Sequence, residues 1–166
     1  GAYSRHPLIR VPTGVGIIWK QRLFDWQLNS TETPSLNQRK IELMRGKVLG
    51  GSSAINAMSH VRGAPADYDG WHDAGCDGWS YNEVAPFFRK SENWIGPPTD
   101  HRGCGGPISV SPAQSVDPLY EAWFEAAKSC GHKVIGDYNA LPHGVPLEGF
   151  ARSQQTIGNG YRVTAS

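Results

Sequence analysis

The segment of the chain best suited to chemistry is a run rich in glycine and serine between Gly46 and Asn56, with the sequence GKVLGGSSAIN. Consecutive glycines let a backbone come close to a bulky ligand because they carry no side chain. Hydroxyl residues that open a helix are followed by backbone amides without a partner, and such amides suit a pyrophosphate or an electron-rich ring. The run therefore indicates an anion or cofactor site.

The same residues also fit an interpretation without a ligand. A helix capped by a serine hydroxyl after a flexible turn has the same composition. The spacing is neither GxGxxG nor GxxxxGK[ST], so it predicts neither a Rossmann fingerprint nor a P-loop. Taken alone, the run leaves both interpretations open.

The spacing of the cysteines gives no indication of a metal site. Cys76, Cys104 and Cys130 are far apart, with no CxxC pair and no histidine at ligand spacing. We expect free, partly buried thiols in a reducing compartment, and therefore a cytoplasmic location. No metal partner is expected.

Charge and composition narrow the class of protein. The net charge is +1 and the Lys and Arg residues are scattered, so we expect no nucleic-acid partner. No apolar run approaches the roughly 18 residues that a membrane helix needs, and the start lacks a signal-peptide pattern, so we expect a soluble segment. With 20 Gly and 12 Pro among 166 residues, the chain is predicted to be irregular α+β, with short elements around one core.

Capping and turn residues predict the elements that must hold the glycine-serine run. Helices are expected over residues 52–58, 65–75, 80–92 and 117–131, and a hairpin is expected from 149–157 and 161–164. Residues 1–45 are expected to be mostly loop, with Trp19, Phe24 and Trp26 as packing anchors.

Two of these helices carry more specific expectations. The sequence Ser80-Tyr81-Asn82-Glu83 is a capping box at the start of the third helix, which Pro86 is expected to bend. In the fourth helix one face is predicted to lie in the core, and it is formed by Leu119, Ala122, Trp123, Ala126, Ala127 and Cys130.

A family resemblance favours the cofactor interpretation. The stretch from Arg45 to Met58, followed by Val61-Arg62-Gly63 and Asp67-Tyr68-Asp69, resembles almost residue for residue the first signature of the glucose–methanol–choline (GMC) family of FAD-dependent alcohol oxidoreductases. Matches outside the signature, such as Gly78-Trp79-Ser80-Tyr81, extend the resemblance over essentially the whole chain.

The resemblance implies a set of residues that line or approach the flavin: Val48, Gly51, Ser52, Asn56, Ala57, Met58 and Ser59. Amides after the double glycine would face the phosphates, and the Asn56 side chain would lie near the isoalloxazine. Some family members bond FAD covalently through a histidine at the position of Ile55. Isoleucine cannot form that bond, so noncovalent FAD is expected here. His60 departs from the signature and is interpreted as a tolerated variant.

The resemblance also implies that the chain is an internal fragment. Residues 1–110 would be part of the FAD-binding domain, with its flavin-covering loop and helix, and 111–166 would begin an incomplete substrate-binding domain. The N-terminal Rossmann unit would precede Gly1, and most of the substrate domain, with the catalytic histidine, would follow Ser166. No catalytic residue is expected within the chain, and the isolated chain is expected to be inactive.

The expected parent enzyme oxidises an alcohol CH–OH group by hydride transfer to flavin N5. Its partners would be a small alcohol and the remainder of the same enzyme. Two alternatives remain open, namely a stand-alone module that binds a small anion or nucleotide, and a structural piece without a ligand.

Overall fold

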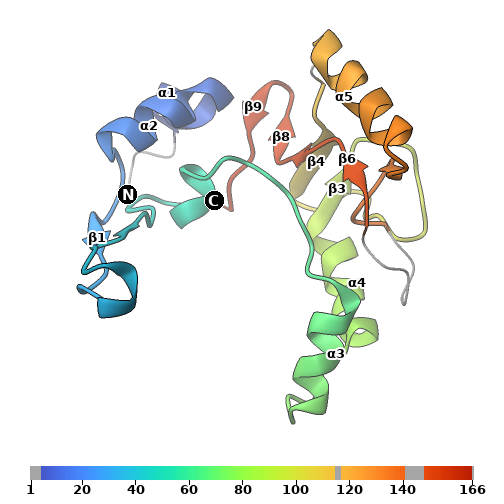
Figure 1. The fold of residues 1–166 in the computed structure, drawn as a ribbon, viewed down its shortest axis with the longest axis horizontal. Helices are drawn as coiled ribbons and strands as arrows, with labels where there is room; N and C mark the ends of the chain where they lie inside the picture. The colour runs from blue at the N-terminus through green and yellow to red at the C-terminus, as the bar shows by residue number, and fades with distance from the viewer. Residues whose placement is uncertain (1–4, 115–116, 141–147, 166) are drawn as a thin grey trace. The chain divides into compact units, whose positions relative to one another are not determined.

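The computed structural model describes residues 5–114, 117–140 and 148–165 (Figure 1). The chain divides into two compact units. One, here called the split unit, consists of residues 1–58 and 156–166, and the other, the central unit, consists of residues 59–155. Both contain short helices and small sheets, which confirms the mixed α+β class predicted from the sequence. The expected domain boundary at residue 110 lies inside strand β4 (Ile108–Pro112), and that assignment stays a prediction about a longer protein.

The split unit is built from short elements separated by turns. In chain order they are α1 (Pro7–Arg10), η2 (Pro12–Gly14), α2 (Val15–Gln21), β1 (Leu28–Asn29), η3 (Pro34–Leu36), β2 (Glu42–Leu43), η4 (Gly51–Ala54), β8 (Ile157–Gly158) and β9 (Tyr161–Arg162). Strands β1 and β2 are antiparallel, as are β8 and β9. Proline stands at the start of three of the short helices, where its missing amide proton is not needed.

A small apolar core holds the split unit together. Its buried residues are Ile9, Ile18, Ala54 and Ile55, against which partly buried Leu8, Phe24, Met44 and Val48 pack. Of the three expected aromatic anchors, Phe24 contacts this core, whereas Trp19 and Trp26 are exposed. The first 45 residues also contain more helix than the expected loop, and α1 and α2 supply two of the core isoleucines.

The helix expected over residues 52–58 is wrong in extent. Only the 3₁₀ turn η4, Gly51–Ala54, forms there. Helical geometry ends because the Asn56 side chain accepts the Met58 amide at 3.0 Å, and because Met58 has a left-handed φ of 63°. A short polar side chain that bonds a nearby amide in this way competes with helix formation.

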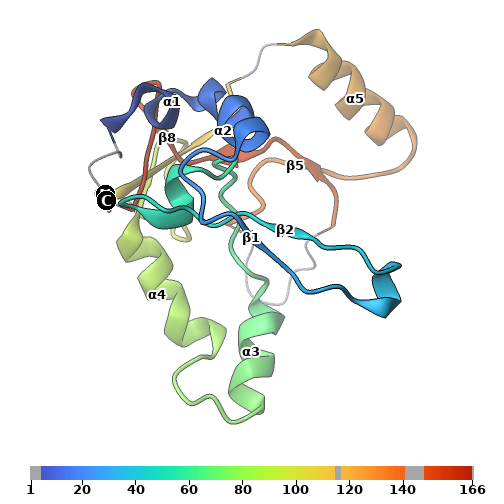
Figure 2. The same cartoon turned by 90° about the vertical axis from the view of Figure 1, so that its left-hand side faces the viewer.

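Among its described residues, the central unit has three helices and five short strands. They are α3 (Pro65–Asp73), α4 (Tyr81–Ser91), β3 (Glu92–Trp94), β4 (Ile108–Pro112), α5 (Pro118–Ser129), β5 (Val134–Ile135), β6 (Phe150–Ala151) and β7 (Gln154–Gln155). In one sheet β4 is parallel to β3 and antiparallel to β7, and β5 pairs with β6 in another. Helices α3 and α4 lie side by side in both views (Figures 1 and 2).

The predicted helices of the central unit are confirmed by their caps. The Glu83 carboxylate accepts hydrogen bonds from the amide (3.1 Å) and hydroxyl (2.5 Å) of Ser80, at the start of α4. Asp69 of α3 accepts the amide of Tyr81 at 2.9 Å, so one helix caps the next. Gly75, just beyond α3, has a left-handed φ of 98°, as a terminating glycine requires.

The predicted core face of α5 is confirmed at Ala127 and wrong at its other residues. The buried residues of this helix are Phe124 and Ala127, whereas Leu119, Trp123 and Cys130 are exposed. The helix therefore packs on its own unit through a narrow stripe, and most of its wider apolar face is exposed, with the Trp123 ring in edge contact with Phe150.

The predicted hairpin is confirmed only around its turn. Strands β8 and β9 pair across Asn159 and Gly160, which both have positive φ. The expected first arm is too long, because Phe150–Ala151 pairs with β5 and Gln154–Gln155 pairs with β4. Each of these dipeptides finds a better hydrogen-bonding partner in the central unit.

Membrane-spanning helices and metal sites were also sought in the described part of the chain. There, no helix is long and apolar enough to cross a membrane. No group of His, Cys, Asp and Glu side chains in the same residues could hold a metal ion. The three cysteines are free, but they are exposed rather than partly buried as expected.

Candidate cofactor-binding segment

Two glycines of the glycine-serine run face different constraints. A Cβ atom on Gly46 would lie 2.2 Å from the Gly51 carbonyl oxygen, so the packing of the turn on itself admits only glycine there. Gly50 and Gly51 have left-handed φ values of 90° and 56°, which favour glycine for conformational reasons. A Cβ atom on Gly51 would meet no protein atom within 4 Å. The backbone at Gly51 is therefore open to the approach of another molecule.

The serine hydroxyls hold the turn in shape. Ser52 Oγ accepts the amide of Gly46 at 3.2 Å, and Ser53 Oγ donates to the Gly50 carbonyl at 2.6 Å. Ser53 Oγ also accepts the amide of Ala165 at 2.9 Å. The hydroxyls thus bond to the protein itself. Within the described residues the Ser52 and Ala57 amides donate no hydrogen bond, and these amides remain available to an acceptor.

Asn56 is oriented by two donors. Its Oδ1 accepts the Met58 amide at 3.0 Å and Arg162 Nη1 at 2.8 Å. Since both partners can only donate, both must meet the oxygen of the side-chain amide. The Nδ2 group is then left without a partner among the described residues and can donate to a ligand.

Ile55 faces the protein interior. Its side chain is buried in the core of the split unit with Ile9 and Ile18, and its carbonyl accepts Trp19 Nε1 at 2.6 Å. Because the side chain lies in the core, it offers no reactive group to a ligand.

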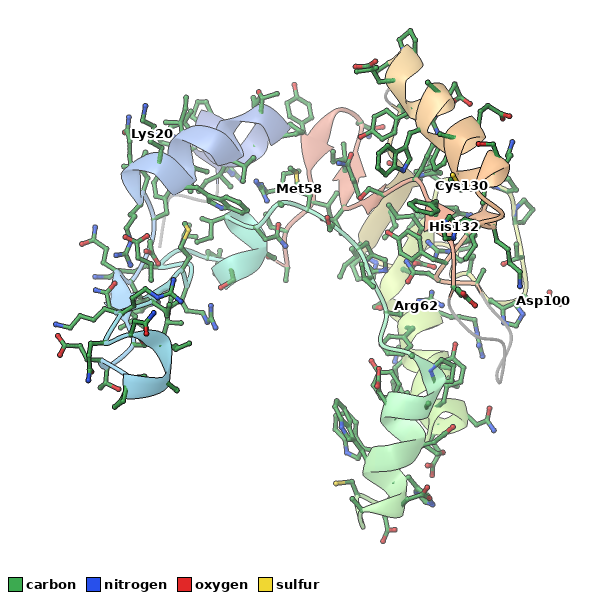
Figure 3. All side chains as sticks on the ribbon, viewed as in Figure 1. Lys20, Met58, Arg62, Asp100, Cys130 and His132 are labelled. Atoms are coloured by element: carbon green, nitrogen blue, oxygen red, sulfur yellow. The ribbon has the colours of Figure 1, made fainter. Side chains whose placement is uncertain are left out.

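The predicted cofactor residues fall into two groups. Val48, Gly51, Ser52, Asn56, Ala57 and Met58 belong to the split unit, where Val48 packs on the core and Met58 is buried at the end of the segment (Figure 3). Ser59 belongs to the central unit, in which it forms an antiparallel bridge with Gln155. The structure thus assembles the first group and does not place Ser59 with it.

The resemblance to the signature does not identify the residue that makes the most contacts to this segment. Arg162, in β9, is buried and bonds to Ser53, Asn56 and Ile9. Its partners are backbone carbonyls and one amide oxygen, and such acceptors leave no pattern in a sequence.

These features suit the demands of FAD. A pyrophosphate needs unpaired backbone amides, and Ser52 and Ala57 provide them. The flavin ring system needs a stretch of backbone that carries no side chain, and the turn at Gly51 provides it. The free Nδ2 of Asn56 adds a neutral donor. The segment therefore fits the cofactor that its sequence resemblance implies.

In the central unit, the signature residue Arg62 and the neighbouring His60 contact the buried carboxylate of Glu92. Glu92 lies 2.8 Å from Arg62, 3.1 Å from Arg102 and 3.3 Å from His60, and it accepts the Gly103 amide at 2.9 Å. Burial acts to raise the pKa of Glu92, but these donors and cations outweigh it and hold the pKa below its ordinary value of 4.5. His60 thus has a structural partner.

Comparison with known proteins identifies the family. The chain belongs to the GMC oxidoreductase family, whose model matches residues 26–155. It is 36% identical over 168 residues to an oxygen-dependent choline dehydrogenase of Vibrio vulnificus, covering 100% of this chain and 29% of that protein. The chain thus spans under a third of that relative's length.

Solved structures agree with this assignment. Pyridoxine 4-oxidase from Mesorbium loti superposes with a TM-score of 0.83 at 31% identity, over 96% of this chain and 31% of that one. A formate oxidase variant from Aspergillus oryzae, studied for the effect of its mutation on FAD modification, gives a TM-score of 0.83 at 28% identity, over 99% and 30%. Members of the family use FAD and act on alcohols.

Proposed function

We propose that this chain is part of a longer FAD-dependent enzyme that oxidises an alcohol, and that residues 46–58 cover the flavin. The observation that carries the proposal is the open, left-handed turn at Gly50 and Gly51, followed by amides without a partner, in a chain of the GMC family. Such a turn admits a bulky ligand that a turn with side chains would exclude.

The residues of the segment have separate roles in this proposal. The Ser52 and Ala57 amides bind the phosphates, and Asn56 Nδ2 donates to the ring system. Ser53 and Val48 hold the turn and its base in place. When bound, FAD supplies the acceptor for the hydride that the alcohol loses. In this proposal the proton acceptor comes from the remainder of the enzyme, as the family resemblance implies. Two histidines of this chain have structural partners, since His6 caps α1 and His60 contacts Glu92.

The test combines a binding measurement with an activity measurement. The complete enzyme should bind FAD and reduce a dye when an alcohol is added, whereas the chain of 166 residues alone should give no turnover. Alcohol-dependent dye reduction by the pure chain would contradict the proposal that the proton acceptor comes from the remainder of the enzyme. Absence of FAD from the complete enzyme would contradict the proposed function itself.

A second candidate function rests on the same unpaired amides. They would also suit a module that binds a small anion or nucleotide without catalysis. A complete enzyme that binds ADP or phosphate but not FAD would favour this alternative.

The proposal extends to the organisation of the longer protein. Residues 1–110 would belong to its FAD-binding domain and 111–166 would begin its substrate-binding domain. Three exposed, free thiols also suit a reducing compartment such as the cytoplasm.

A further inference from the structure

Arg162 is a buried cation that none of the described acidic residues pairs with. Only 6% of the residue is exposed, and its buried Nη2 group has no hydrogen-bond partner in the part of the chain that the structure describes. Burying a charge without a counter-ion is costly, and an apolar side chain of similar volume would fill the space without that cost. The retention of a guanidinium here therefore requires a specific reason.

The hydrogen bonds of Arg162 indicate that reason. Nε donates to the Ile9 carbonyl at 2.9 Å, which fixes the guanidinium on α1. Nη1 donates to the Asn56 carbonyl at 2.7 Å and to Asn56 Oδ1 at 2.8 Å, with a longer bond of 3.3 Å to the Ser53 carbonyl. One side chain thus binds the backbone and the side chain of the same asparagine.

We propose that Arg162 is the positioning residue of the flavin-covering segment, and that it holds Asn56 so that Nδ2 is presented to the cofactor. This inference rests on the proposed function. Arg162 holds the carbonyl and Oδ1 of Asn56 on one side, and the Met58 amide adds a second donor to Oδ1. The side-chain amide therefore cannot turn over without losing two hydrogen bonds.

Lysine cannot replace arginine in this role. Two different nitrogens of the planar guanidinium meet Ile9 and Asn56, whereas an ammonium is a single point of attachment. We expect Arg162→Lys to weaken FAD binding at least tenfold and to shift the visible absorption band of the bound flavin. In the flavin-free protein, hydrogen exchange at the Met58 amide should accelerate, while exchange in α3 and α4 stays unchanged.

A second variant separates positioning from folding. Asn56→Asp keeps an oxygen for Arg162 and Met58 and adds an ion pair to the buried cation, so the flavin-free protein should be at least as stable as the wild type. It lacks the Nδ2 donor, so FAD binding should again fall at least tenfold. The matched control is Arg10→Lys, because Arg10 is an exposed arginine above the neighbouring Tyr161 ring, and it should leave both measurements unchanged.

These measurements give one result if the proposed function is wrong and a different result if only the role of Arg162 is wrong. If the wild-type enzyme binds no FAD, the proposed function fails, whereas exchange at Met58 still reports whether Arg162 orders the segment. If the wild type binds FAD and either Arg162→Lys or Asn56→Asp binds it equally well with the same spectrum, the inference is overturned. General acceleration of exchange in Arg162→Lys, with wild-type FAD binding, would also overturn it.

Discussion

Gly46 and Gly51 lie five positions apart in the same turn, yet their substitution should have different effects. Gly51→Val should abolish FAD binding, because the branched side chain would occupy the open space beside the turn. The strain of a left-handed valine costs about 1–3 kcal/mol, which by itself a tight complex would survive. Flavin absorbance per protein after desalting measures the loss.

The comparison variants for this prediction are Gly46→Ala and Cys104→Ser. Gly46→Ala should destabilise the flavin-free protein, because its new methyl group would collide with the Gly51 carbonyl. Cys104→Ser changes an exposed, free thiol and should leave flavin content unchanged. A fully loaded Gly51→Val enzyme would show that the turn does not contact the cofactor.

Ile55 leads to a prediction about the flavin bond. Because this side chain is buried in the core and carries no nucleophile, acid precipitation of the complete enzyme should leave the yellow colour in the supernatant. Absorbance of the supernatant and pellet checks this. Colour retained in the pellet would indicate a covalent link at a residue other than Ile55.

For single residues, the sequence predicted the segment that we propose as the cofactor site, but it did not predict which residues hold that segment in place. The double glycine and the serines were recognisable because their types limit backbone geometry. Arg162 was not, since its partners are carbonyl groups that every residue possesses.

Among the elements, α4 begins at side-chain caps, one of which, Asp69, belongs to the preceding helix α3. Asp69→Ala removes the acceptor of the Tyr81 amide, and Ser80→Ala removes the hydroxyl that donates to Glu83. Each change should lower the free energy of unfolding of the central unit by about 1 kcal/mol. Urea denaturation followed by circular dichroism measures the loss, with the exposed Lys90→Ala as control. Unchanged midpoints in both variants would mean that α4 does not depend on these caps.

The helices that the sequence predicted well are those whose capping residues lie next to them in the chain. Helices α3 and α4 begin where the Asp67 and Glu83 side chains accept amides three residues earlier, and backbone amides close their ends, so the signals are local in the sequence. The helix expected after Gly51 and the buried face of α5 failed for the opposite reason. The first ends where the Asn56 side chain accepts hydrogen bonds from Met58 and Arg162. The predicted face of the second stays largely exposed, with Trp123 in edge contact with Phe150.

For the molecule as a whole, Glu92 makes the stability of the central unit depend on pH. A carboxyl whose pKa is lowered in the folded state stabilises it fully above the ordinary value of 4.5, and that contribution is lost as the pH falls through the lower, folded value. Glu92→Gln should cost about 3 kcal/mol at neutral pH, because Arg62 and Arg102 would remain buried without their anion.

The pH profile of unfolding tests this prediction. The difference between wild type and Glu92→Gln, measured from urea midpoints, should narrow once the pH falls below 4.5. A constant difference across that range would mean that protonation of Glu92 does not limit stability in acid.

The division of the chain at Met58 and Gln155 could not be read from composition, because neither point carries a linker of distinctive sequence. The boundary arises from the pairing of the final strands, which is a non-local property.

The discontinuity of the split unit also sets an order of events during synthesis. Arg162 and Ile9 are separated by 153 positions, so their hydrogen bond must wait until Arg162 has left the ribosome. The central unit is continuous in sequence and needs no such delay. Closing a loop of this length is an entropic cost that slows folding. Within these residues, the last part to become native is therefore the turn that we propose meets the flavin, which leaves it open to the cofactor until Arg162 has been synthesised.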